Sequence, residues 1–361
     1  MSDAQDNPSR WANVGMLASL ALMLSYAETF VPIPLPGVKL GLANIAVLVA
    51  LSRGDLRGAV CVAIIKVLAV GLLFGSPLTM LYSLVGTGLS LAGTMPLSRL
   101  RTMRLWMLSV VGAVLHVLGQ LAVAAMVMAT NIVWHASPVL IAASCGTGVL
   151  CGMLAQRLAA CIPEDAGVPG GIRLGAPRLA RRPPARMLVA FAGLLTYVVT
   201  MMRLEDPAML GAGVALSAAA CVTARLSPRS LARMGLSLAG IAVCTLVLHS
   251  LFAPQDALRQ TVSATERLAG IAAMSMAFMR IVPKDDLVGT VAWLVMPFER
   301  MGFDTSGFVL SFDVAIRLLP TVSRIVREDI ESHKPHVSLR MMWDLLPRLI
   351  LRLYEEPDVW E

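Results

Sequence analysis

Long apolar runs separated by short turns constrain the fold of this chain more than any other feature of its sequence. Of the 361 residues, 57% are hydrophobic and only 15% are charged, whereas about a quarter of the residues of an average soluble protein are charged. A helix of about 20 apolar residues crosses the hydrocarbon layer of a bilayer. Backbone groups in lipid must be paired within helices or closed barrels. The sequence therefore predicts an all-α fold, a polytopic membrane helix bundle.

About ten of these runs are predicted to be transmembrane helices, and they fall into two groups. The first group lies at residues 11–29, 38–51, 56–74, 77–97, 105–129 and 138–160. The second group lies at residues 187–202, 207–224, 231–252 and 262–279. Ser263 and Glu266 have the spacing of a capping box, which predicts that the fourth helix of the second group begins there.

Residues 162–186 separate the two groups and are rich in proline, glycine and arginine. These residue types break helices and favour solvated turns, so the segment is predicted to be an aqueous linker. The predicted organisation is a six-helix membrane module at 11–161, a cytoplasmic linker at 162–186, a four-helix membrane module at 187–283 and cytoplasmic helices at 284–361.

Basic residues gather in alternate turns of the first module. They are Arg53, Arg57, Arg99, Arg101, Arg104 and Arg157. The intervening turns, near residues 31–37, 75–76 and 130–137, contain neither lysine nor arginine. Because basic residues collect on the cytoplasmic side, we predict a multi-pass protein of the inner (plasma) membrane with a cytoplasmic N-terminus. The net charge of +7 then reflects topology, so the expected partner is the lipid bilayer and not nucleic acid.

The pattern changes after residue 283. Residues 287–296 are too few to span a bilayer, and Pro297 ends that run. Residues 307–330 begin apolar and become amphipathic, with Ile325 and Val326 on one helical face and Arg324, Arg327 and Glu328 on the other. We therefore predict amphipathic cytoplasmic helices in this region.

Polar residues inside the spans are the candidates for ligand binding. A charged residue at the centre of a bilayer costs about 2.5–3.5 kcal/mol on insertion scales, so Lys66 contacts either an anionic ligand or a neighbouring helix. Glu28, near the external end of its span, is either a ligand contact or a solvated interfacial carboxylate. Asn44, His116 and Gln120 either line a midplane or outward-facing cavity or make interhelical hydrogen bonds. The substrate-binding candidates are Glu28, Lys39, Asn44, Lys66, Tyr82, His116 and Gln120.

Enzymatic sites are not expected. Prenyl synthases hold Mg²⁺ with aspartate-rich clusters, and the adjacent aspartates of this chain are only Asp285 and Asp286. The phosphate-binding pattern GxxxxGK[ST] is absent, and the six cysteines form no CxxC pair. We therefore expect no catalytic residue, no cofactor and no metal site.

The first module resembles a known family. The stretches PIPLPGVKLGLANIAVLVAL (residues 32–51), LLFGSPLTMLYSLVGTGLS (72–90) and VVGAVLHVLGQLAVA (110–124) are similar to the Gx transporter family. That family is also described as heptaprenyl diphosphate synthase component I, and it resembles the six-helix S components of energy-coupling factor transporters. The resemblance implies a substrate-binding membrane module.

The second module is similar to the T component, a cobalt-transport-type transmembrane subunit. This resemblance rests on the four-span layout and on residues 284–334, where Arg317 and Pro320 are followed by a charged helix. It implies that cytoplasmic helices dock on a separate ATP-binding cassette ATPase. The ATPase-coupling candidates are Arg317, Arg324, Arg327, Glu328, His333 and Lys334. Where the family carries its first docking motif, this chain has Glu331, Ser332, His333 and Lys334.

Together the resemblances imply a fused importer for a small cofactor or vitamin-like molecule, energised by that ATPase. The alternative is a membrane component associated with heptaprenyl diphosphate synthase and with isoprenoid or quinone metabolism. A scaffold for membrane redox or flavin-handling proteins is a third hypothesis, which no motif favours.

Overall fold

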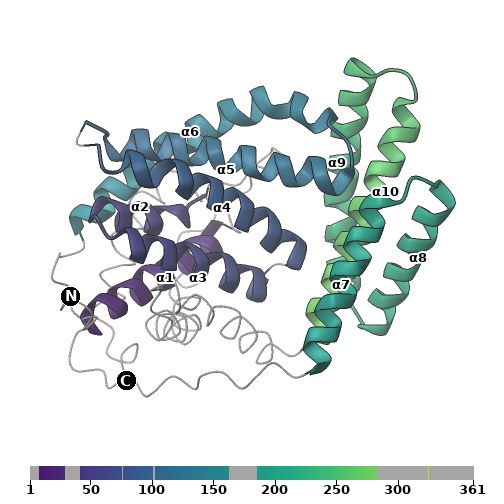
Figure 1. Ribbon diagram of the computed structural model, residues 1–361, viewed down its shortest axis with the longest axis horizontal. Coiled ribbons are helices and arrows are strands. Elements are labelled where there is room, and N and C mark those ends of the chain that lie inside the picture. Colours follow the sequence, from purple (N-terminus) through teal and green to yellow (C-terminus); the bar gives the residue numbers. More distant parts are fainter. Residues whose placement is uncertain are drawn as a thin grey trace.

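The computed structural model describes residues 8–28, 41–74, 76–100, 102–161, 185–282 and 324 (Figure 1). Within these ranges the chain is helical and contains no strand. The helices are α1 (Pro8–Glu28), α2 (Asn44–Ser52), α3 (Leu56–Phe74), α4 (Pro77–Leu97), α5 (Leu105–Met128), the 3-10 turn η1 (Ile132–Ala136), α6 (Ser137–Cys161), α7 (Ala185–Arg203), α8 (Pro207–Thr223), α9 (Pro228–Phe252) and α10 (Ala257–Ile281). The all-α prediction is confirmed.

Five helical segments are long and apolar enough to cross a membrane. They are Pro77–Leu97, Leu105–Met128, Ile132–Ala160, Ala185–Arg203 and Pro228–Phe252. Shorter apolar stretches at Asn13–Ser25 and Pro207–Thr223 lie in α1 and α8. The chain is therefore a helical membrane protein with several candidate spans.

Helix α2 is shorter than the sequence suggests. It begins at Asn44 and contains nine residues, so it is only about 14 Å long, less than half of a bilayer core of about 30 Å. A turn precedes it, in which the Asn44 amide donates to the Gly41 carbonyl at 2.8 Å. Gly41 has a φ of +77°, which a residue with a side chain rarely adopts. The turn could not be predicted from the sequence, because its residues belong to a continuous apolar run.

Local capping chemistry explains several helix starts. Ser76 precedes α4, where its hydroxyl accepts from the Thr79 amide at 3.3 Å and its own amide donates to Thr79 Oγ1 at 2.7 Å. Asp206 and Ser227 cap α8 and α9 before a proline at the first helical position. The predicted capping box of the last helix is wrong. Helix α10 begins at Ala257, so Ser263 and Glu266 lie inside it.

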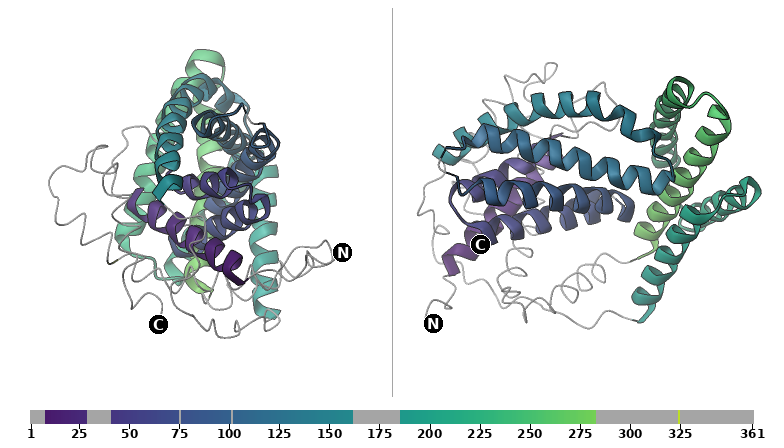
Figure 2. Two further views of the ribbon diagram at one scale, coloured as in Figure 1. Left: turned by 90° about the vertical axis from the view of Figure 1, so that its left-hand side faces the viewer. Right: turned by 45° about the horizontal axis from the view of Figure 1, so that its top comes forward.

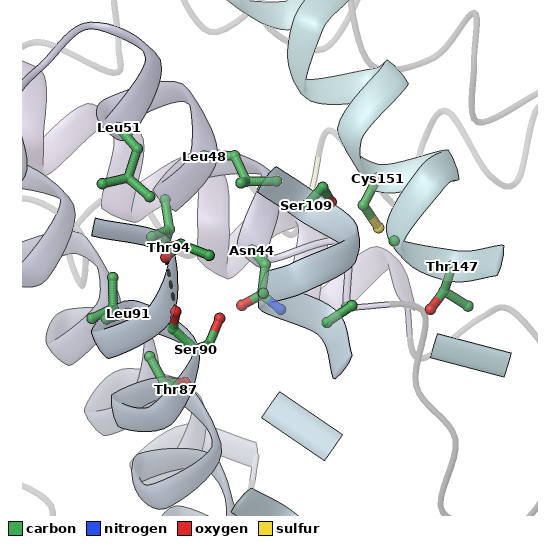
Figure 3. Close-up of a pocket in the computed structure, with 15 residues that line it drawn as sticks. Asn44, Leu48, Leu51, Thr87, Ser90, Leu91, Thr94, Ser109, Thr147 and Cys151 are labelled. Atoms are coloured by element: carbon green, nitrogen blue, oxygen red, sulfur yellow. Dashed lines mark hydrogen bonds between the residues drawn. The ribbon is translucent and has the colours of Figure 1, made fainter. Parts of the chain in front are cut away.

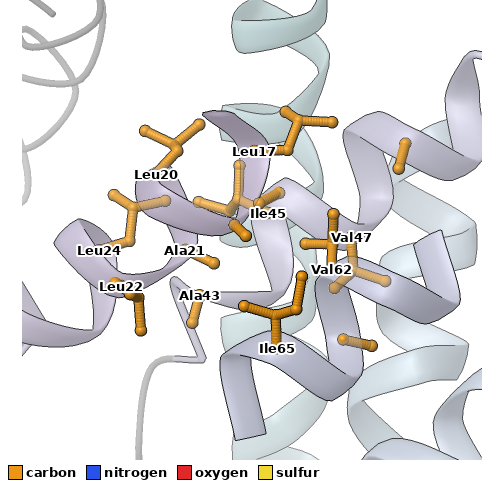
Figure 4. Close-up of a cluster of buried hydrophobic side chains, with 14 of the residues drawn as sticks. Leu17, Leu20, Ala21, Leu22, Leu24, Ala43, Ile45, Val47, Val62 and Ile65 are labelled. Atoms are coloured by element: carbon orange, nitrogen blue, oxygen red, sulfur yellow. The ribbon is translucent and has the colours of Figure 1, made fainter. Parts of the chain in front are cut away.

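Helices α1, α3, α5 and α6 pack around α2. Every residue from Ile45 to Leu51 is buried, because α1, α3 and α6 all contact this helix. Leu22 of α1, Ile45 of α2 and Ile65 of α3 are fully buried in the resulting cluster (Figure 4). Helix α2 therefore lies inside the protein, away from lipid.

Glycines bring α4, α5 and α6 close together. A Cβ added at Gly119 of α5 would lie 2.8 Å from the Gly86 Cα of α4. A Cβ at Gly148 of α6 would lie 2.8 Å from the Val110 Cα of α5. Such close backbone approach is what small residues provide in membrane helix packing. The three helices run side by side in Figure 1 and in the right-hand view of Figure 2.

The C-terminal helices, α7 to α10, cross the ends of α4, α5 and α6 (Figures 1 and 2). Helix α10 is central among them and contacts α7, α8 and α9, as well as α4 and α5. Leu268 and Ile271 of α10 share an apolar cluster with Leu78 of α4 and Val127 of α5. The two groups of helices therefore share a buried apolar contact.

A buried arginine completes this junction. Arg267 of α10 is 9% exposed. It donates from Nη2 to the Leu204 carbonyl at 2.7 Å and from Nη1 to the Met128 carbonyl at 3.4 Å. These carbonyls lie at the C-terminal ends of α7 and α5, where the helix dipole is negative. Two helix ends thus stabilise one buried positive charge.

A buried histidine lies beside the same junction. His249 of α9 is fully buried, and its Nδ1 lies 3.1 Å from Thr261 Oγ1 of α10. Its Nε2 lies 3.5 Å from Thr130 Oγ1, just beyond the end of α5. The junction between the two groups of helices therefore combines an apolar cluster with buried polar contacts.

Candidate binding site

A small pocket with a cavity volume of about 40 Å³ lies among α2, α4, α5 and α6 (Figure 3). A cavity of this size has room for a few water molecules. Its polar lining consists of Asn44, Thr87, Ser90, Thr94, Ser109 and Thr147, together with the thiol of Cys151. Its apolar lining includes Leu48 and Leu91.

The start of α2 forms one edge of the pocket. Asn44 lines the pocket, and its Oδ1 accepts a hydrogen bond of 2.5 Å from the Lys66 ammonium of α3. Gly41 also lines the pocket, and its amide donates to Glu28 Oε1 at 2.8 Å. Lys66 is only 6% exposed. One carboxylate and one ammonium therefore meet at the turn where α2 begins.

Helix α4 contributes a row of hydroxyl groups. Thr87, Ser90 and Thr94 are spaced i, i+3 and i+7, which places them on one helical face. Thr94 Oγ1 donates to the Ser90 carbonyl of its own helix at 2.8 Å. In Figure 3 the three side chains follow one another along α4 at the pocket wall.

Thr87 is the most informative member of the row. Its side chain is only 7% exposed, and its Oγ1 has no hydrogen-bond partner among the residues that the structure describes. Leaving a buried hydroxyl unpaired costs about 1–3 kcal/mol.

Of the three glycines that line the pocket, Gly112 leaves the space in front of the hydroxyl row open. A Cβ added at Gly112 of α5 would lie 3.0 Å from Ser90 Oγ and 3.1 Å from Thr94 Cγ2. Gly148 of α6, in the same wall, packs against α5. Any larger residue at position 112 would fill the space in front of the hydroxyl row.

The structure brings three of the predicted binding residues together, namely Glu28, Asn44 and Lys66. Asn44 lines the pocket, whereas Tyr82, His116 and Gln120 do not. His116 packs against Gly86 of α4, where an added Cβ would lie 2.8 Å from its carbonyl oxygen. Lys39 lies outside the described residues, as do the ATPase-coupling candidates Arg317, Arg327, Glu328, His333 and Lys334. Arg324, which is described, is helical and exposed.

The pocket lies toward the ends of α4 and α5 that carry basic residues. Thr94 is five residues from Arg99, and Ser109 is five residues from Arg104. The sequence had suggested a midplane or outward-facing cavity built by Asn44, His116 and Gln120. The hydroxyl row moves the polar space toward the opposite end of α5, away from the turn at Thr130.

Sequence reasoning missed the hydroxyl groups of the pocket. The available signal was the i, i+3, i+7 spacing on α4, where three polar residues share one face of an apolar helix. No group of three or more His, Cys, Asp and Glu side chains in the described ranges could hold a metal ion.

The comparison with known proteins gives a match in the N-terminal helices, α1 to α6. Residues 17–158 match the family described as heptaprenyl diphosphate synthase component I. The matched stretch begins within α1, ends within α6 and includes every residue that lines the pocket. The sequence resemblance of the N-terminal helices to heptaprenyl diphosphate synthase component I is thus supported. No curated protein and no solved structure matches the chain.

Proposed function

We propose that the chain is the membrane-embedded part of an importer for a small cofactor or vitamin-like molecule. In this proposal the N-terminal helices bind the substrate, the C-terminal helices transmit motion, and a separate ATP-binding cassette ATPase supplies the energy. The observation that carries the proposal is the pocket among α2, α4, α5 and α6, whose lining includes a row of hydroxyl-bearing residues on α4.

The contacts of the C-terminal helices support a role for both halves. Arg267 connects the end of α5 with the end of α7, and α5 also forms one wall of the pocket. A movement of α7 and α10 would therefore reach the pocket through a single helix. The protein itself would perform no catalytic step.

The alternative function is that of a membrane component associated with heptaprenyl diphosphate synthase. The description of the matching family favours it. In that case a soluble prenyl synthase subunit, not an ATPase, would be the partner.

Purification of the tagged full chain in mild detergent, followed by quantitative mass spectrometry, separates the two functions. We expect ATP-binding cassette subunits to co-purify and to support ATP-dependent uptake of a radiolabelled vitamin after reconstitution in vesicles. Co-purification of a prenyl synthase subunit, whose activity falls when the chain is removed, would favour the alternative. ATPase binding without uptake of any vitamin tested would contradict the importer.

A further inference from the structure

We propose that one face of α9 is a binding site for an anionic phospholipid. The phosphate of the lipid is held by Arg229 and Arg233, and an acyl chain lies along the apolar side chains that follow them. The site belongs to a different group of helices from the pocket among α2, α4, α5 and α6. It goes beyond the proposed function and does not depend on it, because it concerns the surface that the protein presents to lipid.

Helix α9 has few contacts with the rest of the protein. It is long and apolar enough to cross a membrane, and only 6% of its most apolar stretch of 18 residues is buried. Its buried residues are Thr245 and His249, on the side where α9 contacts α10 and η1. The remaining surface of the helix is therefore open to lipid.

Two arginines and a row of apolar side chains share the face of α9 that points away from the protein. With 3.6 residues per turn, six exposed residues fall within about 40° of one line along the helix, on the opposite side from Thr245 and His249. They are Arg229, Arg233, Leu236, Val243, Val247 and Leu251. This face is therefore basic at one end and apolar along the rest of its length, as a phospholipid is polar at one end and apolar along its chains.

The apolar part of this face is as long as one leaflet of a bilayer is thick. The helix rises about 16 Å between Leu236 and Val247. The hydrocarbon layer of one leaflet is about 15 Å thick, half of a bilayer core of about 30 Å. An acyl chain can therefore lie along these side chains while the phosphate of the same lipid contacts Arg233.

The basic end of α9 has no acidic residue on its own helix or on the helix before it. Arg225, in the turn between α8 and α9, is exposed, as are Arg229 and Arg233. The sequence contains neither aspartate nor glutamate from residue 207 to residue 255. No ion pair is formed by these three arginines within the described part of the chain. Three positive charges are therefore gathered at one end of α9, and no carboxylate of α8 or α9 neutralises them.

The end of α10 adds a fourth positive charge. Ala277 of α10 belongs to the same apolar cluster as Leu226 and Leu231, so this end of α10 packs beside the start of α9. Arg280 follows three residues later and is exposed. The acidic residues that precede α8 and α10 lie at the other ends of those helices. The described charges at this end of the C-terminal helices are therefore of one sign.

Guanidinium groups are well suited to the phosphate of a lipid. Each can donate two parallel hydrogen bonds to phosphate oxygens, and the positive end of the helix dipole adds to the attraction at the start of α9. Phosphatidylglycerol has an uncharged headgroup alcohol, so its phosphate leaves the lipid with a net negative charge. Phosphatidylcholine has the same phosphate, but its quaternary ammonium would lie beside the arginines. The site should therefore prefer the anionic lipid.

Native mass spectrometry of the full chain in detergent measures this preference. The protein is titrated with dioleoyl phosphatidylglycerol or with dioleoyl phosphatidylcholine, which differ only in their headgroups. We expect the first phosphatidylglycerol to bind with a Kd lower by at least about fivefold, and equal affinities would overturn the proposal. Inorganic phosphate should displace the lipid no better than sodium chloride at the same ionic strength. Selective displacement by phosphate would assign the arginines to free phosphate instead of lipid, against the proposal.

The double variant Arg229→Gln and Arg233→Gln removes both charges and keeps polar, exposed side chains. Its Kd for phosphatidylglycerol should rise by at least about fivefold, close to the Kd for phosphatidylcholine. The matched control is the double variant Arg203→Gln and Arg259→Gln. It also removes two exposed arginines, each of which has an acidic residue within three positions, and should leave the Kd nearly unchanged. Equal losses in the two double variants would show that net charge alone attracts the lipid, and the site would be wrong.

A photoreactive acyl chain locates the bound lipid. Phosphatidylglycerol and phosphatidylcholine with a diazirine in the middle of one chain are added separately to the full chain, and the labelled peptides are identified after irradiation. Helix α7, where Leu195 is exposed, serves as the reference for contact with bulk lipid. We expect the labelling of residues 236–247 relative to α7 to be at least about threefold higher with phosphatidylglycerol, and this excess to disappear in Arg229→Gln and Arg233→Gln. The same ratio for both lipids would place the anionic lipid elsewhere and contradict the assignment to α9.

Discussion

The Lys66 ammonium lies 2.5 Å from Asn44 Oδ1, at the point where a helix of nine residues begins inside the protein. This contact joins α3 to the pocket edge. It places a buried charge beside the turn that shortens α2, and the amide of Asn44 connects that charge to the lining of the pocket.

Asn44→Leu should destabilise the protein more than Lys66→Met. The first change removes an acceptor and leaves the buried ammonium behind, whereas the second removes the charge that needed the acceptor. We expect Asn44→Leu to cost about 1.5–3 kcal/mol and the double variant to recover part of this loss. Thermal unfolding in detergent measures all three, and a double variant less stable than Asn44→Leu would contradict the explanation.

Gly112→Ala should close the pocket. The added Cβ would lie 3.0 Å from Ser90 Oγ and 3.1 Å from Thr94 Cγ2, so it occupies the space in front of the hydroxyl row. Binding of a substrate that occupies the pocket should weaken by at least about tenfold. The matched control is Gly88→Ala on α4, where an added Cβ meets nothing within 4 Å, and this variant should bind normally. Equal effects of the two variants would count against the pocket.

Arg267→Met should weaken the junction between the N-terminal and C-terminal helices. It removes two hydrogen bonds from a charged donor to the carbonyls of Leu204 and Met128, with an expected cost of about 2–4 kcal/mol. Arg267→Lys should be intermediate, because an ammonium lacks the fork of a guanidinium. Arg280→Met, at an exposed position of α10, is the control. The midpoints of thermal unfolding in detergent, measured for the three variants, give their order of stability.

Division of the chain within residues 162–184 should leave two fragments that still associate. The described contacts between the two groups of helices do not need this segment, since Arg267 and the apolar cluster around Leu268 lie in α10. Co-expression of the two fragments with different tags, followed by affinity purification in detergent, measures the association. Arg267→Met in the second fragment should lower the recovered first fragment severalfold, and fragments that fail to insert separately would contradict a two-module organisation.

The apolar runs predicted most of the helices. The bounds of α3 and α4 agree with their predicted ranges at both ends, because Arg53, Gly54, Ser76 and Pro77 are strong boundary signals. The predicted range of α2 began too early, because residues 41–43 are apolar and the turn that they form does not lower the hydropathy of the run. The start of α10 was misplaced because Asp256 has a φ of +61°, which its residue type only weakly signals.

From the sequence, only those residues near the site whose side chains are costly to bury could be predicted. A lysine, an asparagine and a glutamate in apolar runs are conspicuous, and Lys66, Asn44 and Glu28 do meet at one turn. Serine and threonine hydroxyl groups can donate to carbonyls of their own helix, so the sequence did not mark Thr87 as a residue of the pocket. The empty space itself depends on which helix faces Gly112, and a single sequence does not specify that contact.

Arg267 also fixes the order in which the protein can be completed during synthesis. Its two carbonyl partners precede it by 139 and 63 residues. When the ribosome has made α5 and α7, their C-terminal carbonyls have no guanidinium to accept from. Both carbonyls can accept hydrogen bonds from Arg267 only after α10 has been synthesised. The contact between α5 and α10 therefore forms more than a hundred residues after α5 has been made.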